Sequence, residues 1–173
     1  MRNLNNLLAL AFTAFMISCG AKEEKKKGFE YQDTPETPVE TKAMEKADQN
    51  VTEITITGND MMKFNLTEIR VKAGQKVKLT LTHVGKLDKK VMGHNFVIVV
   101  PGTDMSAFAM EAATAADNDY IPADTDKVIV HTKLLGGGES DTIEFDAPAQ
   151  GTYDFLCSFP GHFAMMNGKF IVE

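Results

Sequence analysis

Apolar side chains recur at every second position along several short segments of residues 51–173, and this pattern limits the fold more than any other feature. Such alternation is typical of half-buried β-strands, whose side chains point to opposite faces in turn. The alternating positions are Ile54 and Ile56; Met62, Phe64 and Leu66; Val77, Leu79 and Leu81; Ile143 and Phe145; and Tyr153, Phe155 and Cys157. Continuous apolar runs at 96–100, 128–130 and 170–172 add further strands, and turn residues at 58–60, 73–75, 136–138 and 150–151 separate them. About eight strands in this length predict an all-β domain, a sandwich or barrel of antiparallel or mixed sheets.

One segment of this region has a different period. Residues 104–116 are rich in alanine, and apolar residues fall at helical spacing within them, at Met105, Phe108, Ala109 and Ala112. Thr103 and Asp104 stand before the segment as capping residues. We therefore expect one short helix near residues 104–116, with its methionine and phenylalanine in the core.

Charge and composition exclude several classes of protein. The 173 residues include 18 basic and 24 acidic side chains, which give a formal net charge of −6. A nucleic-acid-binding surface needs clustered positive charge, so this balance argues against DNA or RNA as a partner. At 43% hydrophobic and 24% charged residues, the composition is that of a globular protein with a packed core. Two cysteines cannot form a disulfide scaffold, so each cysteine needs its own explanation.

The N-terminus has the layout of a secretory signal. Arg2 precedes an apolar run at 7–17 that is too short to span a membrane, and the run ends at Ser18 and Cys19. The sequence Met-Ile-Ser-Cys-Gly at 16–20 resembles the lipobox of bacterial lipoproteins, with methionine where that pattern usually has leucine. We expect residues 1–18 to be a signal peptide and Cys19 to be lipidated. The exported protein is then held at a membrane, on its periplasmic or cell-surface side, by acyl chains. An ordinary cleaved signal with an incidental Cys19 is the alternative.

Residues 19–50 differ in composition from the residues on either side. From residue 20 onward they mix six lysines with eight acidic residues and two prolines, and they contain few large apolar side chains. Such a segment buries too little surface to offset the entropy of ordering it. We interpret it as a disordered tether that leads to a single domain at residues 51–173.

Three potential metal ligands lie close together near the C-terminus. Cys157, His162 and Met166 follow one another in a Cys-x4-His-x3-Met spacing, on a loop expected between two strands. His94, within Met-Gly-His-Asn at 92–95, supplies a second imidazole at the start of an apolar strand. Sulfur ligands favour Cu(I) and imidazoles accept Cu(II), so this set suits copper in both oxidation states. The sequence therefore predicts a site for one copper ion.

These segments, with Gly-Asn-Asp at 58–60 and His-Thr-Lys-Leu-Leu-Gly at 131–136, resemble the azurins, blue-copper proteins of the cupredoxin family. The resemblance covers residues 51–173 and implies a Greek-key β-sandwich with one type 1 copper site. The ligand set that it implies is His94, Cys157 and His162 in a trigonal plane, Met166 as a long axial ligand, and the Gly93 carbonyl opposite Met166. Met165 competes for the axial position, but the His-x3-Met spacing selects its neighbour. The resemblance also implies that Asn95 and Phe159 lie just outside the ligands, where Asn95 braces the two ligand loops.

The sequence departs from that family in two places. Azurins usually carry a disulfide near the start of the domain, and the matching positions here are Thr52 and about Gly74. Its absence removes a stabilising contribution of about 2–4 kcal/mol without touching the copper ligands. Phe96 stands where many azurins have a core tryptophan, in agreement with a chain that has no tryptophan.

A site with four protein ligands leaves no position for a substrate, so we expect an electron carrier outside the cytoplasm and not an enzyme. By analogy, the edge of His162 is the electron port. The apolar collar expected around it consists of Met62, Met92, Phe159, Pro160, Ala164 and Met165. Such a collar suits short-lived contacts with redox proteins such as c-type cytochromes or copper-containing reductases. We expect the protein itself to be a monomer in solution.

Several alternatives stay open on the sequence alone. Periplasmic copper storage or delivery is the main rival function, although residues 20–50 supply no Met- or His-rich tract for it. A lipid-anchored adhesion domain with a relic site is a third, and zinc is the next metal to consider. His83 resembles an azurin histidine near the site that responds to pH. The alternative is that His83 has a purely structural role. His131 lies in a predicted strand and is expected to be a surface or structural residue, not a ligand.

Overall fold

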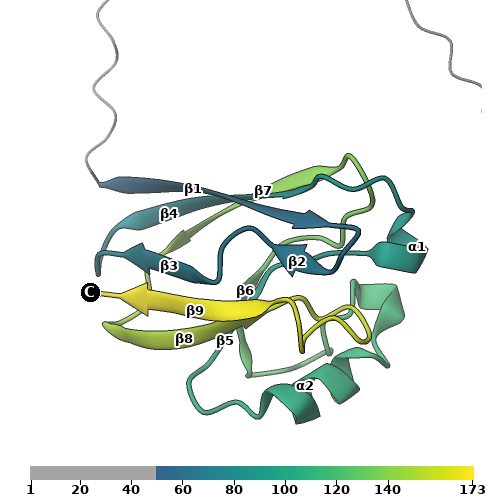
Figure 1. Cartoon of the computed structure of the whole chain (residues 1–173). Coiled ribbons are helices and arrows are strands. Elements are labelled where there is room, and N and C mark those ends of the chain that lie inside the picture. The colour runs from purple at the N-terminus through teal and green to yellow at the C-terminus, as the bar shows by residue number, and fades with distance from the viewer. Residues whose placement is uncertain (1–49) are drawn as a thin grey trace, which may run out of the picture. The chain divides into compact units, whose positions relative to one another are not determined.

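The computed structural model describes residues 50–173, which form a sandwich of two β-sheets (Figure 1). The expected signal peptide, Cys19 and the tether at 19–50 lie outside the described residues, apart from Asn50. The strands are β1 (Val51–Asn59), β2 (Lys63–Phe64), β3 (Glu68–Val71), β4 (Lys76–His83), β5 (Val97–Val99), β6 (Val128–His131), β7 (Ser140–Asp146), β8 (Gly151–Leu156) and β9 (Asn167–Val172). The helices are α1 (Lys89–Met92), α2 (Met105–Ala112) and the 3-10 turn η1 (Ala116–Asn118). The described part of the chain thus confirms the mostly β prediction, with nine strands where about eight were expected.

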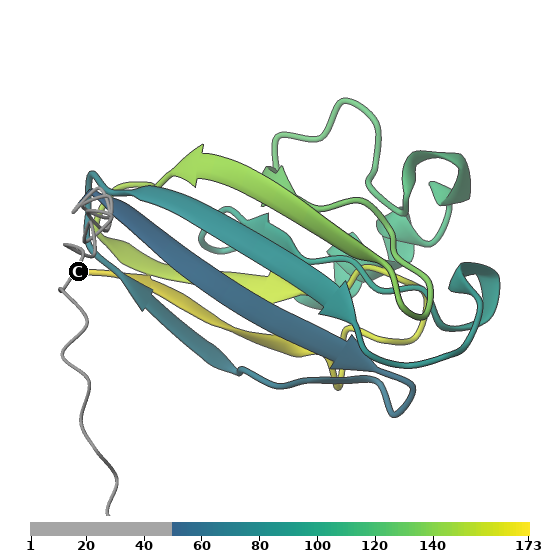
Figure 2. The ribbon, with the colours of Figure 1, turned by 90° about the horizontal axis from the view of Figure 1, so that it is seen from above.

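The two sheets mix parallel and antiparallel neighbours. One sheet has the order β2-β1-β4-β7 and the other the order β3-β9-β8-β5-β6. The pairs β1·β4 and β3·β9 are parallel, and the remaining pairs are antiparallel. Seen from above, the long strands of the two sheets run side by side over most of the domain (Figure 2).

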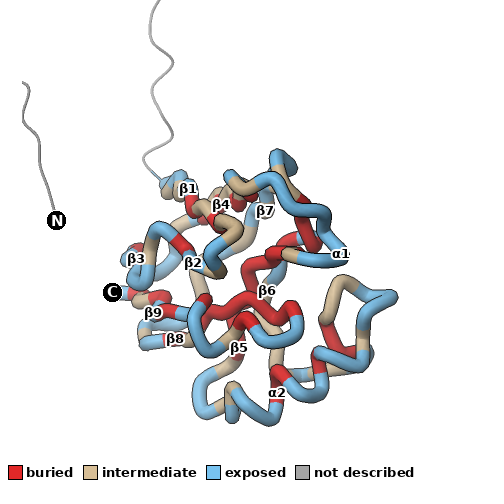
Figure 3. The backbone as a smooth tube through the Cα atoms, turned by 45° about the vertical axis from the view of Figure 1, so that its right-hand side comes forward, coloured by how far each residue is buried: buried red, intermediate tan, exposed pale blue. Residues whose placement is uncertain are grey.

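Alternating side chains from both sheets meet in one core. Along β4, Val77, Leu79 and Leu81 are fully buried while the residues between them are partly exposed, as the period of two predicts. Aromatic rings fill the middle of the sandwich: the centroids of Phe96 and Phe155 lie 5.0 Å apart. Phe96 itself is 0% exposed, so the position of the family's tryptophan is a buried aromatic here too. In the burial view, buried residues follow the strands and the loops at the α1 end (Figure 3).

The helix predicted at 104–116 is α2, and it covers the outer face of the five-stranded sheet. It begins where expected, because the Asp104 carboxylate accepts hydrogen bonds from the backbone N–H groups of Ser106 and Ala107. It ends at Ala112, four residues early, and a turn and η1 follow. Phe108 packs with Val97 and other apolar residues in a second cluster on this face. Strand β5 is therefore buried on both faces, which explains its continuous apolar run.

Some elements were not predicted, and the strand expected near residues 62–66 was predicted too long. Strand β3 and helix α1 had no place in the sequence interpretation. The strand expected across Met62, Phe64 and Leu66 is only the pair Lys63–Phe64, because Met62 lies in a turn with a left-handed φ of 54°. At the other end of β1, Thr52 donates a hydrogen bond of 2.7 Å to Gln75 Oε1, beside the position where the resemblance places the missing disulfide. No helix of the described residues is long and apolar enough to cross a membrane.

Candidate metal centre

Three donor atoms converge at one end of the sandwich. His94 follows α1 and is paired with Leu135, Cys157 follows the last residue of β8, and His162 lies in the turn between β8 and β9. The Sγ of Cys157 lies 4.0 Å from Nδ1 of His94 and 3.6 Å from Nδ1 of His162. The ligand atoms of all three residues lie within 4.8 Å of one another, and all three residues are buried.

This spacing fits a metal ion. Bonds of about 2.0 Å to nitrogen and about 2.3 Å to sulfur, spread over a plane, leave the donors about 3.5–4 Å apart. The distances from Sγ fall in this range, so the donors are spaced for one ion between them. A thiolate with two imidazoles is the trigonal set of blue-copper sites. The residues that the structure brings together are therefore those that the sequence selected.

The two candidate axial atoms come from Gly93 and Met166. The carbonyl oxygen of Gly93 lies 3.8 Å from Sγ of Cys157. Met166 is fully buried, and its backbone carbonyl accepts a hydrogen bond from the Cys157 N–H at 2.9 Å. The Met165 side chain is 53% exposed, so it is a poorer candidate for the axial ligand than the buried Met166.

Gly58, near the end of β1, allows the side chains of His94 and Met166 to pack closely against the backbone. The sequence interpretation gave it no such role. A Cβ atom at this position would lie 2.8 Å from Cδ2 of His94 and 3.3 Å from Cε of Met166. Contacts under 3.0 Å are too short for real Cβ atoms, so a larger residue would displace one of the two candidate ligands. In the sequence, Gly-Asn-Asp at 58–60 was interpreted as a turn and as part of the resemblance to azurins, without a role for Gly58 at the metal site.

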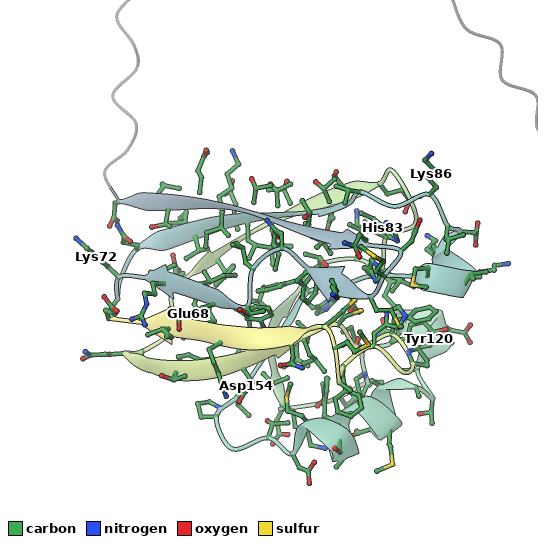
Figure 4. All side chains as sticks on the ribbon, viewed as in Figure 1. Glu68, Lys72, His83, Lys86, Tyr120 and Asp154 are labelled. Atoms are coloured by element: carbon green, nitrogen blue, oxygen red, sulfur yellow. The ribbon has the colours of Figure 1, made fainter. Side chains whose placement is uncertain are left out.

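Hydrogen bonds hold the first histidine ready for a metal. The Nε2–H of His94 donates to the carbonyl of Asn59 at 2.9 Å, which leaves Nδ1 free with its lone pair facing Cys157. His83 stacks on the same ring, with the centroids 4.3 Å apart. The ring nitrogens of His83 are both used, since Nδ1 accepts from the Gly85 N–H and Nε2–H donates to the Met92 carbonyl. These bonds fit a structural role for His83, and the sticks view shows this residue at the ligand end of the sandwich (Figure 4).

His162 differs from His94 because its Nε2 atom forms no hydrogen bond with the described residues. Every fully buried side-chain nitrogen and oxygen atom of the described residues has a hydrogen-bond partner. None of the hydrogen bonds of the described residues involves Nε2 of His162, so this atom reaches the surface although the residue is only 3% exposed. The ring of Phe159 packs beside His162, with the centroids 4.6 Å apart.

The side chain of Asn95 forms hydrogen bonds that connect the two ligand loops. Its Oδ1 accepts from the Ser158 N–H at 2.8 Å, and its Nδ2 donates to Ser158 Oγ at 2.8 Å and to the Asp119 carbonyl at 2.9 Å. Asn95 is 0% exposed and follows His94 directly, while Ser158 follows Cys157. The Asn95 side chain therefore fixes the positions of His94 and Cys157 relative to each other.

The third partner of Asn95 belongs to a strained turn that the sequence did not single out. Asp119 and Tyr120 both have left-handed backbone angles, with φ of 51° and 60°. Non-glycine residues adopt this region at a cost, and such residues cluster at functional sites. The ring of Tyr120 packs edge-on against Phe159 at 5.1 Å, so the turn supports the ligand loop from outside. No sequence signal marks Tyr120, because its contact is made to a residue 39 positions away.

Burial sets the protonation states of the three donor side chains. It raises the pKa of the Cys157 thiol to about 12, against the opposing effect of the backbone N–H groups of Asn95 and Phe159. Burial also lowers the pKa of His162 to about 4, helped by His94 and His83, and it lowers the pKa of His94. At neutral pH both imidazoles are therefore uncharged and able to ligate, while the thiol releases its proton when a metal binds.

The expected collar residues differ in exposure. Pro160 and Ala164 are exposed, and Met62 and Met92 are half-buried. Phe159 is only 9% exposed, so it contributes packing beside His162 more than exposed surface. His131, at the end of β6, is exposed and pairs with Val97 across the sheet, in agreement with a surface or structural role.

Comparisons with known proteins agree with this geometry. The profile of the family described as copper binding proteins, plastocyanin/azurin family, matches residues 50–173. Azurin-1 of Alcaligenes xylosoxydans xylosoxydans is 44% identical over 119 residues, which cover 66% of this chain and 92% of that protein. The outer membrane protein H.8 of Neisseria gonorrhoeae is 46% identical over 89 residues, 50% of this chain and 48% of that protein. Among solved structures, reduced auracyanin from Roseiflexus castenholzii superposes with a TM-score of 0.64 at 38% identity, over 70% of this chain and 97% of that one. The chain belongs to the plastocyanin/azurin family of copper-binding proteins.

Proposed function

We propose that this domain carries single electrons between redox proteins outside the cytoplasm, through one type 1 copper ion held by Cys157, His94 and His162. The closed donor set carries the proposal: three buried donors face one another, and Met166 and the Gly93 carbonyl adjoin them. Such a donor set leaves no open coordination position for a substrate, whereas electron transfer requires no open position. Bound copper supplies the one-electron change between Cu(I) and Cu(II).

The protein's part is to hold the donors still. The hydrogen bonds of His94 to Asn59 and of Asn95 to Ser158 use atoms other than the metal donors, so they would hold the donors in position around an ion. Sulfur and nitrogen donors in this fixed set give neither oxidation state its preferred geometry, so little rearrangement accompanies electron transfer. The burial of the three donors would keep water away from a bound ion.

The electron port is the Nε2 edge of His162. This nitrogen has no partner among the described residues and reaches the surface, whereas Nε2 of His94 is bonded and buried. Exposed Pro160, Ala164 and Met165 lie on the same loop, an apolar setting that suits brief contacts with partners such as c-type cytochromes or copper-containing reductases.

A copper titration tests the site. The purified full chain, reduced and copper-free, is mixed with Cu(II) and followed by visible absorption and electron paramagnetic resonance. We expect an intense blue sulfur-to-copper band with narrow hyperfine splitting, which Cys157→Ser abolishes. A colourless or weakly coloured complex would overturn the electron-carrier reading, and copper storage or delivery would take its place.

A matched pair of variants tests the port. Met165→Lys places a charge beside His162, whereas Met110→Lys places the same charge on α2, where the native side chain is 70% exposed. Oxidation of reduced cytochrome c by the copper-loaded protein should slow for the first variant and not for the second, with the blue band unchanged in both. Equal rates for the two variants would refute the port.

The same reading places the protein at a membrane through lipid on Cys19. The supports are the lipobox-like sequence at 16–20 and a relative that is named an outer membrane protein. Labelled palmitate should enter the wild-type chain in bacteria, and Cys19→Ser should abolish labelling and release the protein from the membrane fraction. An unlabelled wild-type chain would show that the signal is of the ordinary cleaved kind.

A further inference from the structure

Four of the six exposed large hydrophobic side chains of the described residues lie on two turns and on helix α1, at the ligand end of the domain. They are Met61 (66% exposed), Val84 (57%), Leu87 (41%) and Val91 (63%). The Asp60 carboxylate joins the two turns, because it accepts hydrogen bonds from the backbone N–H groups of Lys86 at 2.8 Å and Leu87 at 3.3 Å. We call these four residues, with Lys86, Lys89 and Lys90, the α1 surface.

The α1 surface is held in place although it buries almost nothing. Helix α1 has no buried residue. Its start is capped by Asp88, whose carboxylate accepts from the Lys90 N–H at 2.8 Å, and the Leu87 carbonyl accepts from the Gly137 N–H at 2.8 Å. Exposed apolar side chains on a backbone fixed by hydrogen bonds form a surface that is ordered before a partner arrives, which lowers the entropy lost on binding.

The cations of this surface are unpaired. Lys86, Lys89 and Lys90 are exposed, and none of them forms an ion pair with a described carboxylate. Of the eight other lysine and arginine residues at 50–173, six form ion pairs, for example Arg70 with Glu68 and Lys127 with Glu111, whereas Lys63 and Lys72 do not.

Neighbouring carboxylates do not satisfy these lysines. The carboxylates of Asp60, Asp88 and Glu139 accept hydrogen bonds from backbone N–H groups of the surrounding loops. Asp117 and Asp119 line a pocket together with Lys89 and Lys90, but no ion pair joins these aspartates to these lysines. Three ammonium groups thus face solvent around exposed valine and leucine, on a chain whose net charge is −6.

We propose that the α1 surface docks a redox protein whose electron-exchange edge is apolar and ringed by carboxylates. The proposal rests on the proposed function and specifies the surface chemistry of the redox partner of the same copper site. The surface adjoins the ligands: α1 ends one residue before Gly93, where an added Cβ would lie 2.5 Å from the Lys89 carbonyl and 2.8 Å from the Phe159 ring. The chain enters the domain at β1, at the end of the sandwich opposite α1, which leaves this surface away from the attachment point (Figure 1).

Opposite charges on two surfaces raise the rate at which they meet, and salt removes the gain. The test uses the copper-loaded full chain and reduced cytochrome b5, a small haem protein whose exposed haem edge carries carboxylates. The variant Lys86→Glu/Lys89→Glu/Lys90→Glu should slow the second-order rate at low ionic strength by about tenfold or more, and the difference should vanish near 1 M salt. With reduced cytochrome c, whose haem edge is ringed by lysines, the same variant should be faster than wild type.

Single substitutions supply the matched control. Lys89→Glu and Lys72→Glu change the net charge equally, and the two native lysines are both exposed and unpaired at opposite ends of the sandwich. Figure 4 labels Lys72 and Lys86 at these two ends. We expect Lys89→Glu to slow the reaction with cytochrome b5 several-fold and Lys72→Glu to leave it within twofold of wild type. Equal effects would mean that only net charge matters and would overturn the proposal.

Two further outcomes separate this proposal from its rivals. A variant that keeps its blue band and reacts with cytochrome b5 at the wild-type rate refutes the α1 surface while the proposed function stands. A wild-type chain with no blue band refutes both. Sedimentation of the Cys19→Ser chain with phosphatidylglycerol vesicles, lost in the triple variant, combined with an unchanged rate, would show that the surface meets an anionic lipid surface instead.

Discussion

Replacing Asn95 by alanine should destabilise the domain far more than the loss of one polar side chain suggests. The native amide makes three hydrogen bonds of 2.8–2.9 Å, to the Ser158 N–H, to Ser158 Oγ and to the Asp119 carbonyl. Asn95 is 0% and Ser158 1% exposed, so water cannot replace the first two bonds without opening the loop. A buried group that loses its partner costs about 1–3 kcal/mol. We therefore expect the free energy of unfolding to fall by about 3–5 kcal/mol.

Asn65→Ala is the matched control, since the Asn65 side chain accepts a single hydrogen bond, from the Thr57 N–H at an exposed turn. Its cost should stay near about 1 kcal/mol. Urea unfolding of both copper-free variants gives the two free energies, and the blue band of the copper-loaded forms should shift or broaden only for Asn95→Ala. If the two variants lose equal stability, Asn95 is not what holds the ligand loops together.

Three shorter predictions rest on the same geometry. Gly58→Ala brings a Cβ to 2.8 Å from His94, so denaturation should show a loss of about 1–3 kcal/mol and the copper spectrum should change; an unaltered spectrum would contradict the role of Gly58. The pKa of His162 is lowered from 6.5 to about 4, so the unfolded chain binds more protons between these values, and unfolding of the copper-free protein should become easier as the pH falls from 6.5 to 4. His162→Gln should weaken that pH dependence, and an identical profile would count against it. In the copper-free Cys19→Ser chain, the pKa of Cys157, raised from 9.0 to about 12, predicts alkylation by iodoacetamide at pH 8 about 1,000-fold slower than in urea; comparable rates would show that the thiol is not shielded.

The sequence predicted those parts of the domain in which local pattern and final environment agree. Strand β4 alternates perfectly because one face packs on the core, and the donors on the C-terminal loop follow one another at fixed spacing. Helix α1 could not be predicted, because Lys-Lys-Val-Met has no apolar stripe and buries nothing. It is held instead by contacts such as that of Asp60 with the Lys86 N–H, 26 residues away. Strand β3 offers only two alternating apolar residues, too few to distinguish it from a loop.

The misplaced strand at residues 62–66 illustrates the same limit. Met62, Phe64 and Leu66 alternate as a strand should, yet only Phe64 is fully turned into the core. The Asn59 carbonyl accepts from the Met62 N–H at 3.0 Å and also from the His94 ring. This turn is therefore shaped by the need to hold a ligand 35 residues away, a constraint that no local periodicity expresses.

The burial that closes the site also decides which ions can enter it. A thiol whose pKa is raised to about 12 keeps its proton at pH 7 unless a cation replaces that proton, and the cation must then bind sulfur strongly. Copper satisfies this requirement better than harder divalent ions, because thiolate and thioether are soft ligands. The neutral imidazoles favour the same exchange, since no positive charge on His94 or His162 has to be displaced. Burial thus disfavours a Cys157 thiolate without a bound metal, favours a metal that binds sulfur strongly and keeps substrates from the site. Each of these effects suits a protein that transfers electrons and retains its metal.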